Sequence, residues 1–163
     1  MGVGKPVWSP DGKRIALEHF GDGDTQPSQV FVLNVDGTNL HRVSVNSGVV
    51  YAESDPAWSP DGSELAYWSY GYGLAVTSAG GGVPIAVYRD FPRVSYGAKP
   101  AWSHDGMTLA FNRWRSSSND ARSVVVIELY AGGHLELVHD GYDLAYSPDQ
   151  KRIAYTMSRS DST

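Results

Sequence analysis

A chain of 163 residues, 41% hydrophobic and 19% charged, has the size and composition of one globular domain. Its net charge of -5 argues against a nucleic-acid partner, because such binding depends on basic patches. The absence of cysteine excludes disulfides and thiolate metal sites, and no apolar run is long enough to cross a membrane.

One short phrase recurs four times along the chain. The first copy, residues 6–12, reads Pro-Val-Trp-Ser-Pro-Asp-Gly, and the others occupy residues 56–62, 100–106 and 144–150. The aromatic residues of the four copies are Trp8, Trp58, Trp102 and Tyr146, which are 50, 44 and 44 residues apart. A fixed period in this range indicates a repeat architecture.

Each copy predicts a hairpin between two short strands. Proline and aspartate favour the tight turn, and glycine accepts the left-handed conformation that closes it. The aromatic residue ends the first strand, where we expect its ring to pack against a neighbouring sheet. The second strand carries an alanine in every copy, which would allow another sheet to approach closely. These alanines are Ala16, Ala66, Ala110 and Ala154.

Two further strands complete each unit. In chain order they are predicted at 29–35 and 40–45, at 73–77 and 83–87, and at 123–129 and 134–138. The fourth unit has its first two strands only, near 142–146 and 152–157. The runs are short and β-branched, with glycine and proline between them, which argues against a helical repeat. Four antiparallel strands in each 40–50 residues are typical of a β-propeller blade.

The phrase, followed by Ile-Ala-Phe/Tyr, resembles the TolB-type, WD-like propeller repeat of bacterial proteins. Tyr146 and Gln150 depart from the pattern in the fourth copy. We therefore predict an all-β, partial propeller of about three and a half blades, forming one domain over residues 1–163. The expected blades are 3–50, 51–94 and 95–140, with a half blade at 141–158. Because such rings usually close with more blades, we expect either a fragment of a longer chain or two copies that complete a ring.

In such a fold, the loops that differ between blades share one face. These loops span 20–28, 46–55, 88–99 and 114–122, and variable loops on a repeated scaffold usually carry binding. Several aromatic and arginine residues lie in or beside them, as at binding hot spots. The binding candidates are Tyr51, Glu53, Arg89, Phe91, Arg93, Tyr96, Arg113, Trp114 and Arg115. The alternative is structural: the rings cap the blades and the arginines pair with Asp90 or Asp120.

The signals for a metal or a reaction are weak. His19, Asp22 and Asp24 are metal candidates, but they lack the ligand pattern of a calcium loop, and a Gly/Asp turn is the preferred interpretation. The chain has no Gly-x-Ser-x-Gly nucleophile elbow. The repeated serine and aspartate of the turns are expected to be structural. We therefore assign no catalytic residue and expect no cofactor.

These patterns favour a non-enzymatic module that binds a protein or peptide, and a homodimer if the chain is complete. The resemblance implies periplasmic or envelope scaffolding, although the sequence shows no apolar signal segment, so the cytoplasm is equally compatible. It also leaves two alternatives. One is an accessory propeller of a prolyl-oligopeptidase-like serine peptidase, and the other is a carbohydrate-active propeller, for which His19, Asp22 and Glu53 would be the first residues to test.

Overall fold

In the computed structural model, strands are the only regular elements among the residues described. These are residues 2–4, 6–20, 27–43, 52–70, 73–88, 99–114, 122–129, 131, 133–139, 141–149 and 151–157. Of residues 113, 114, 122, 134–139 and 141–143 only the backbone is described. The chain forms two compact units, Met1–Asp90 and Phe91–Thr163, and each is treated by itself below.

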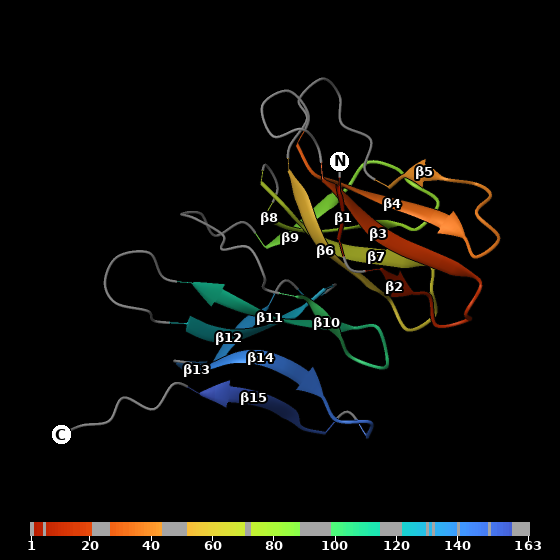
Figure 1. Ribbon diagram of the computed structural model, residues 1–163. Coiled ribbons are helices and arrows are strands. Elements are labelled where there is room, and N and C mark those ends of the chain that lie inside the picture. The colour runs from red at the N-terminus through yellow and green to blue at the C-terminus, as the bar shows by residue number, and fades with distance from the viewer. Residues whose placement is uncertain are drawn as a thin grey trace. The chain divides into compact units, whose positions relative to one another are not determined.

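The first sheet of unit 1 is an antiparallel sheet whose first strand is interrupted. Both β1 and β2 pair with β3, and the order continues through β4 to β5 (Figure 1). The alternating apolar residues of 29–34 and the Asp36-Gly37 turn place the third strand as predicted. The strands are β1 (Gly2–Val3), β2 (Val7–Trp8), β3 (Arg14–Phe20), β4 (Gln29–Asn34) and β5 (His41–Arg42).

The second sheet of unit 1 follows the predicted order, each strand pairing with the next one in the chain. Its strands are β6 (Glu53–Trp58), β7 (Glu64–Ser69), β8 (Gly73–Ser78) and β9 (Ile85–Tyr88). Three glycines, 80–82, separate β8 from β9, and two of them have positive φ angles, which glycine adopts without strain. This sheet lies against the first sheet through β6, which packs on β3 and β4.

Unit 2 repeats the pattern with one complete sheet and half of another. The complete sheet has β10 (Ala101–Trp102), β11 (Thr108–Trp114), β12 (Arg122–Glu128) and β13 (His134–His139). The half sheet pairs β14 (Gly141–Tyr146) with β15 (Ile153–Met157), and β14 packs on β11 and β12 as β6 packs on β3 and β4. The predicted fold class, an all-β partial propeller, is confirmed.

Hydrogen bonds explain why the turn phrase recurs. Ser9 Oγ donates to Asp11 Oδ1 at 2.6 Å and accepts from the Arg14 backbone N–H at 2.9 Å. Asp11 Oδ1 also accepts from the Lys13 backbone N–H at 3.0 Å, and Gly12 has a φ of 67°. The same serine–aspartate bond, 2.6 Å long, closes the other three turns. The repeated serine and aspartate are therefore structural, as predicted.

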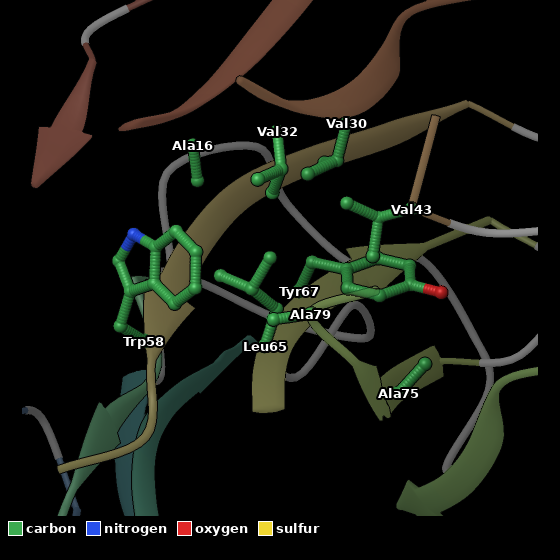
Figure 2. Close-up of a cluster of buried hydrophobic side chains, with 9 residues drawn as sticks. All are labelled: Ala16, Val30, Val32, Val43, Trp58, Leu65, Tyr67, Ala75 and Ala79. Atoms are coloured by element: carbon green, nitrogen blue, oxygen red, sulfur yellow. The ribbon is translucent and has the colours of Figure 1, made fainter. Parts of the chain in front are cut away.

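The core of unit 1 lies between its two sheets, where Trp58 is 7% exposed. Figure 2 shows valines of the first sheet facing Leu65 and Tyr67 of the second. The Trp58 indole Nε1 donates to the backbone oxygen of Val7 at 3.0 Å, which ties β6 to β2. The cluster comprises Ala16, Val30, Val32, Val43, Trp58, Leu65, Tyr67, Ala75 and Ala79.

The repeated aromatic positions differ in their surroundings. The prediction that each ring packs against a neighbouring sheet is wrong for Trp8, which is 59% exposed. In unit 2, Tyr146 takes the place of the tryptophan, and its hydroxyl lies 2.9 Å from Thr108 Oγ1 on β11. Ala16 is fully buried beneath the second sheet, whereas Ala154 on β15 is exposed. Packing of the repeat residues therefore depends on whether a further sheet covers them.

Candidate binding face

The end of unit 1 opposite the serine–aspartate turns is the face on which we predicted binding. We call it the loop-end face and define it by Val3, Phe20, Ser28, Asp55 and Tyr70. β3 ends there, and β6 begins there. The Tyr70 backbone N–H donates to the Ala52 oxygen at 2.9 Å, which fixes the end of β7 beside the start of β6.

A recurrent bulge shapes the first strand of three blades among the residues described. Between Ser54 and Ala57, β6 contains one residue more than the paired stretch of β7. The same one-residue excess occurs between Val3 and Val7 opposite β3, and in β14 opposite β15. In β6 the bulge holds Asp55, a non-glycine residue with a φ of 53°. Bulges re-aim side chains at strand ends, and this one directs the backbone of Asp55 toward the first sheet.

Glu18, on β3, meets that bulge. Burial raises the pKa of the Glu18 carboxyl, and the Asp55 carboxylate raises it further. Hydrogen bonds from the Ser28 hydroxyl and the Asp55 backbone N–H lower the pKa of Glu18, but by less than burial and the Asp55 carboxylate raise it. Two carboxyl groups therefore share one part of the loop-end face, and one of them holds its proton to a higher pH than an ordinary glutamate.

Glu53 joins the two sheets of unit 1 from the inside. One carboxylate oxygen, Oε1, lies 3.3 Å from Arg42 Nη2, and the other, Oε2, accepts from the Val30 backbone N–H at 3.2 Å. The Glu53 backbone N–H donates to the Ser28 oxygen at 2.8 Å. The Glu53 side chain is 1% exposed, and a charge at that depth needs such partners. The structure thus places this binding candidate beneath the loop-end face.

Apolar side chains are exposed on the loop-end face itself. Phe20 lies over the two glycines that flank Val3: a Cβ atom at Gly2 would come within 3.2 Å of its ring, and one at Gly4 within 3.4 Å. Val3 and Tyr70 are also exposed at this end, and Tyr70 is the most exposed aromatic residue among those described. Exposed aromatic residues of this kind are enriched where proteins bind one another.

Most other predicted binding residues fall outside the described part of the chain. Tyr51, Arg89, Phe91, Arg93, Tyr96 and Arg115 lie outside it. Arg113 and Trp114 form the end of β11, described by its backbone alone. Their part in binding stays a prediction.

The metal candidates are divided in the same way. His19 is the last residue but one of β3, and its ring packs edge-on against Phe31, with ring centroids 6.0 Å apart and planes at 70°. Asp22 and Asp24 lie outside the described residues. Within the described residues, no group of three or more His, Cys, Asp or Glu side chains could hold a metal ion.

Sequence reasoning did not single out Glu18, Asp55 or Tyr70 as binding candidates. Glu18 sits in an ordinary position of β3, and Tyr70 follows β7 outside the predicted loops. Asp55 lies at the end of the predicted loop 46–55, and its positive φ is set by the bulge. A usable signal for Asp55 was its place just before the proline of the repeat phrase.

No part of the described structure is a helix long and apolar enough to span a membrane.

Comparison with solved structures gives matches over nearly the whole chain. A protein assigned as a TolB from Agrobacterium tumefaciens matches 98% of this chain and 55% of its own, with a TM-score of 0.74 and 22% identity. An oligogalacturonate lyase in complex with manganese matches 96% and 45%, with a TM-score of 0.71 and 20% identity. A prolyl endopeptidase matches 96% and 25%, with a TM-score of 0.63 and 19% identity.

These likenesses show the fold. The chain spans about half or less of the length of the structures that it matches. Comparison with protein-family models gives no match, and comparison with curated proteins gives none either. The chain therefore has the β-propeller-type fold of TolB-like proteins, at 19–22% identity to these three structural neighbours.

Proposed function

We propose that this chain is a non-enzymatic module that binds a protein or peptide through its loop-end face, as a segment of a TolB-like propeller. The observation that carries the proposal is the exposure of Val3, Phe20 and Tyr70 at one end of unit 1. The opposite end of each blade is closed by serine–aspartate turns that satisfy their own hydrogen bonds. At the loop end, a partner would find exposed apolar side chains beside the loops that differ between blades.

The charges beside these side chains suggest the chemistry of the partner. Glu18 lies beside Phe20, because a Cβ atom at Gly4 would meet both side chains, and the Asp55 carboxylate is close enough to raise the pKa of Glu18. The chain as a whole carries a net charge of -5. A complementary segment would offer apolar side chains flanked by lysine or arginine. Glu53 would support this face from beneath rather than touch the partner.

Two alternatives draw on the same fold. The oligogalacturonate lyase among the neighbours suggests a carbohydrate-active propeller, with His19, Asp22 and Glu53 as residues to test. The prolyl endopeptidase suggests an accessory segment of a peptidase. Calorimetry with manganese and an oligogalacturonate tests the first alternative. Tight binding of the sugar that His19→Ala removes would favour it over the proposed module.

Peptides selected from a random display library against the immobilised chain would test the proposal. We expect Phe20→Ser and Tyr70→Ser each to weaken the selected peptides by about tenfold or more, as hot-spot truncations do. Val83→Ser and Ile85→Ser are matched controls, because both side chains are exposed but lie at the turn end of unit 1. Unchanged affinity in the first pair, or equal loss in the controls, would contradict the proposal.

A further inference from the structure

The contacts between the two sheets of unit 1 show how one blade of this chain packs against the next. Trp58 of the second sheet donates its Nε1 hydrogen to the Val7 oxygen at 3.0 Å. The Arg14 guanidinium lies 4.8 Å from the Trp58 ring centroid and donates to the Gly62 oxygen at 2.7 Å. Ala16 is buried beneath this contact. We call the Val7 oxygen, Arg14 and Ala16 the receiving set, because the second sheet packs on them.

The half sheet of β14 and β15 carries the same receiving set, uncovered. The sequence Lys-Arg-Ile-Ala occurs at 13–16 in the first blade and again at 151–154. Arg152 takes the place of Arg14, Ala154 that of Ala16, and the Ala145 backbone that of Val7. The Arg152 side chain is 80% exposed, and both alanines are exposed as well.

The other side of the first blade carries the counterparts of the residues with which the second sheet packs on the receiving set, and these counterparts are not covered by another sheet. Trp8 takes the place of Trp58 and is largely exposed. Ile15 and Leu17 take the places of Leu65 and Tyr67, but they are only partly buried, whereas the latter two are fully buried. The glycines of the two turns also differ in whether another residue lies close to them. A Cβ atom at Gly62 would lie 3.2 Å from Arg14 Nη2, whereas one at Gly12 would meet nothing within 4 Å.

We propose that two copies of this chain associate head to tail, with the Trp8 surface of one copy seated on the β14–β15 sheet of the other. The Trp8 indole would donate to the Ala145 oxygen, and the Arg152 guanidinium would cover the Trp8 ring and donate to the Gly12 oxygen. Each copy carries both halves of the contact, so the interface is heterologous. The argument is independent of the loop-end face, and either proposal can fail without the other.

The occupant follows from the chemistry of the two surfaces. An exposed indole needs an acceptor for its N–H and gains from a cation above its ring. Arg152 and the Ala145 oxygen supply both, on strands whose sequence and pairing match those of the receiving strands in the first blade. A second copy is therefore the partner that brings this set with the correct spacing.

Light scattering during size exclusion, over a series of protein concentrations, tests the proposal. The wild-type chain should show a mass that rises above the monomer value of 17.7 kDa as concentration increases. Trp8→Ala and Arg152→Ala should each weaken association by about tenfold or more. The controls Lys151→Ala and Tyr70→Ala, both at exposed positions outside the contact, should associate as the wild type does.

Mixing the two variants gives a sharper result. Trp8→Ala keeps the Arg152 surface, and Arg152→Ala keeps the Trp8 surface, so the mixture can form one intact contact that neither variant forms alone. Association should therefore be stronger in the mixture than in either variant. Circular dichroism on each variant verifies that the fold is retained. A wild-type chain that stays monomeric throughout, variants that associate like the wild type, or a mixture no stronger than its components would overturn the proposal.

Discussion

The guanidinium carbon of Arg14 lies 4.8 Å from the centroid of the Trp58 ring, so a cation from one sheet covers the aromatic ring of the next. The same guanidinium donates to the backbone oxygen of Gly62. One arginine therefore ties the turn phrase of the second blade to the start of β3. This contact links the repeat seen in the sequence to the packing of one blade on another.

Trp58→Ala should lower the free energy of unfolding by about 3–5 kcal/mol, because it removes a large buried ring and leaves the Val7 oxygen without its indole donor. Trp58→Phe should cost less, since an aromatic ring remains. Urea unfolding followed by circular dichroism measures both. Trp8→Ala is the matched control, because Trp8 occupies the same repeat position but is exposed. In dilute monomer it should change stability by no more than about 0.5 kcal/mol. Equal losses at the two positions would contradict this account of the interface.

Gly62→Ala should destabilise the chain more than Gly12→Ala. Both glycines have positive φ angles, 72° and 67°, so each substitution carries a similar backbone cost. Only at Gly62 would the new methyl group press on the Arg14 guanidinium. Chemical denaturation of the two variants isolates that difference. Introducing Arg14→Ala into both should bring their unfolding free energies together, and a persistent gap would show that Arg14 is not its cause.

Breaking the ion pair between Arg42 and Glu53 should be costly. Arg42→Met leaves a carboxylate that is 1% exposed without its cation, and we expect a loss of about 3 kcal/mol or more. Adding Glu53→Gln to Arg42→Met should recover part of that loss, because the buried charge is then removed. Thermal and urea unfolding of the wild type, the two single variants and the double variant give the coupling free energy between Arg42 and Glu53. A double variant as unstable as the sum of the singles would mean that the pair contributes no mutual stabilisation.

Acid should weaken the turns. The Ser59 hydroxyl, and next the Ser63 backbone N–H, lower the pKa of Asp61 from 3.8 to about 2. Because the pKa of Asp61 is lower in the folded than in the unfolded state, its carboxylate stabilises the fold above about pH 3.8. This stabilisation is lost as the pH falls through about 2. The pKa values of Asp11, Asp105 and Asp149 are lowered for the same reason. The stability advantage of the wild type over Asp61→Asn, measured in urea, should therefore shrink as the pH falls through this range.

Glu18 should behave in the opposite way. Burial and the Asp55 carboxylate raise its pKa above 4.5. Its contribution is therefore present at low pH and is lost as the pH rises through the raised value. Relative to the wild type, Glu18→Gln should gain stability with rising pH, whereas Asp61→Asn loses it. Parallel pH profiles for the two variants would contradict these assignments.

The repeat made much of the fold predictable. Serine, aspartate and glycine at fixed spacing are the groups that close the hairpin, so the turns and the strands around them could be placed from residue types alone. The bulge could not, because it depends on the pairing of β6 with β7 and on the positive φ of Asp55. Identical repeat positions also gave no warning that Trp8 is exposed while Trp58 is buried, since burial is set by the neighbouring sheet.

The candidate site was less predictable than the fold. The choice of the variable loops directed attention to the end where Phe20 and Tyr70 are exposed, and binding at that end stays a prediction. The roles of Arg42 and Glu53 arise from contacts across two sheets, and no local pattern marks them. Glu53 was selected for its place in a loop, yet it enters the core interface because Arg42 and Val30 offer partners there.

The most direct test of the central claim is a hydrogen-exchange footprint of a library-selected peptide on the intact chain. If the loop-end face binds, the bound peptide should slow exchange around Val3, Phe20 and Tyr70 and leave residues 83–85 at the turn end unchanged. Protection confined to residues 83–85, with the loop end exchanging as in the unbound chain, would contradict the proposed function.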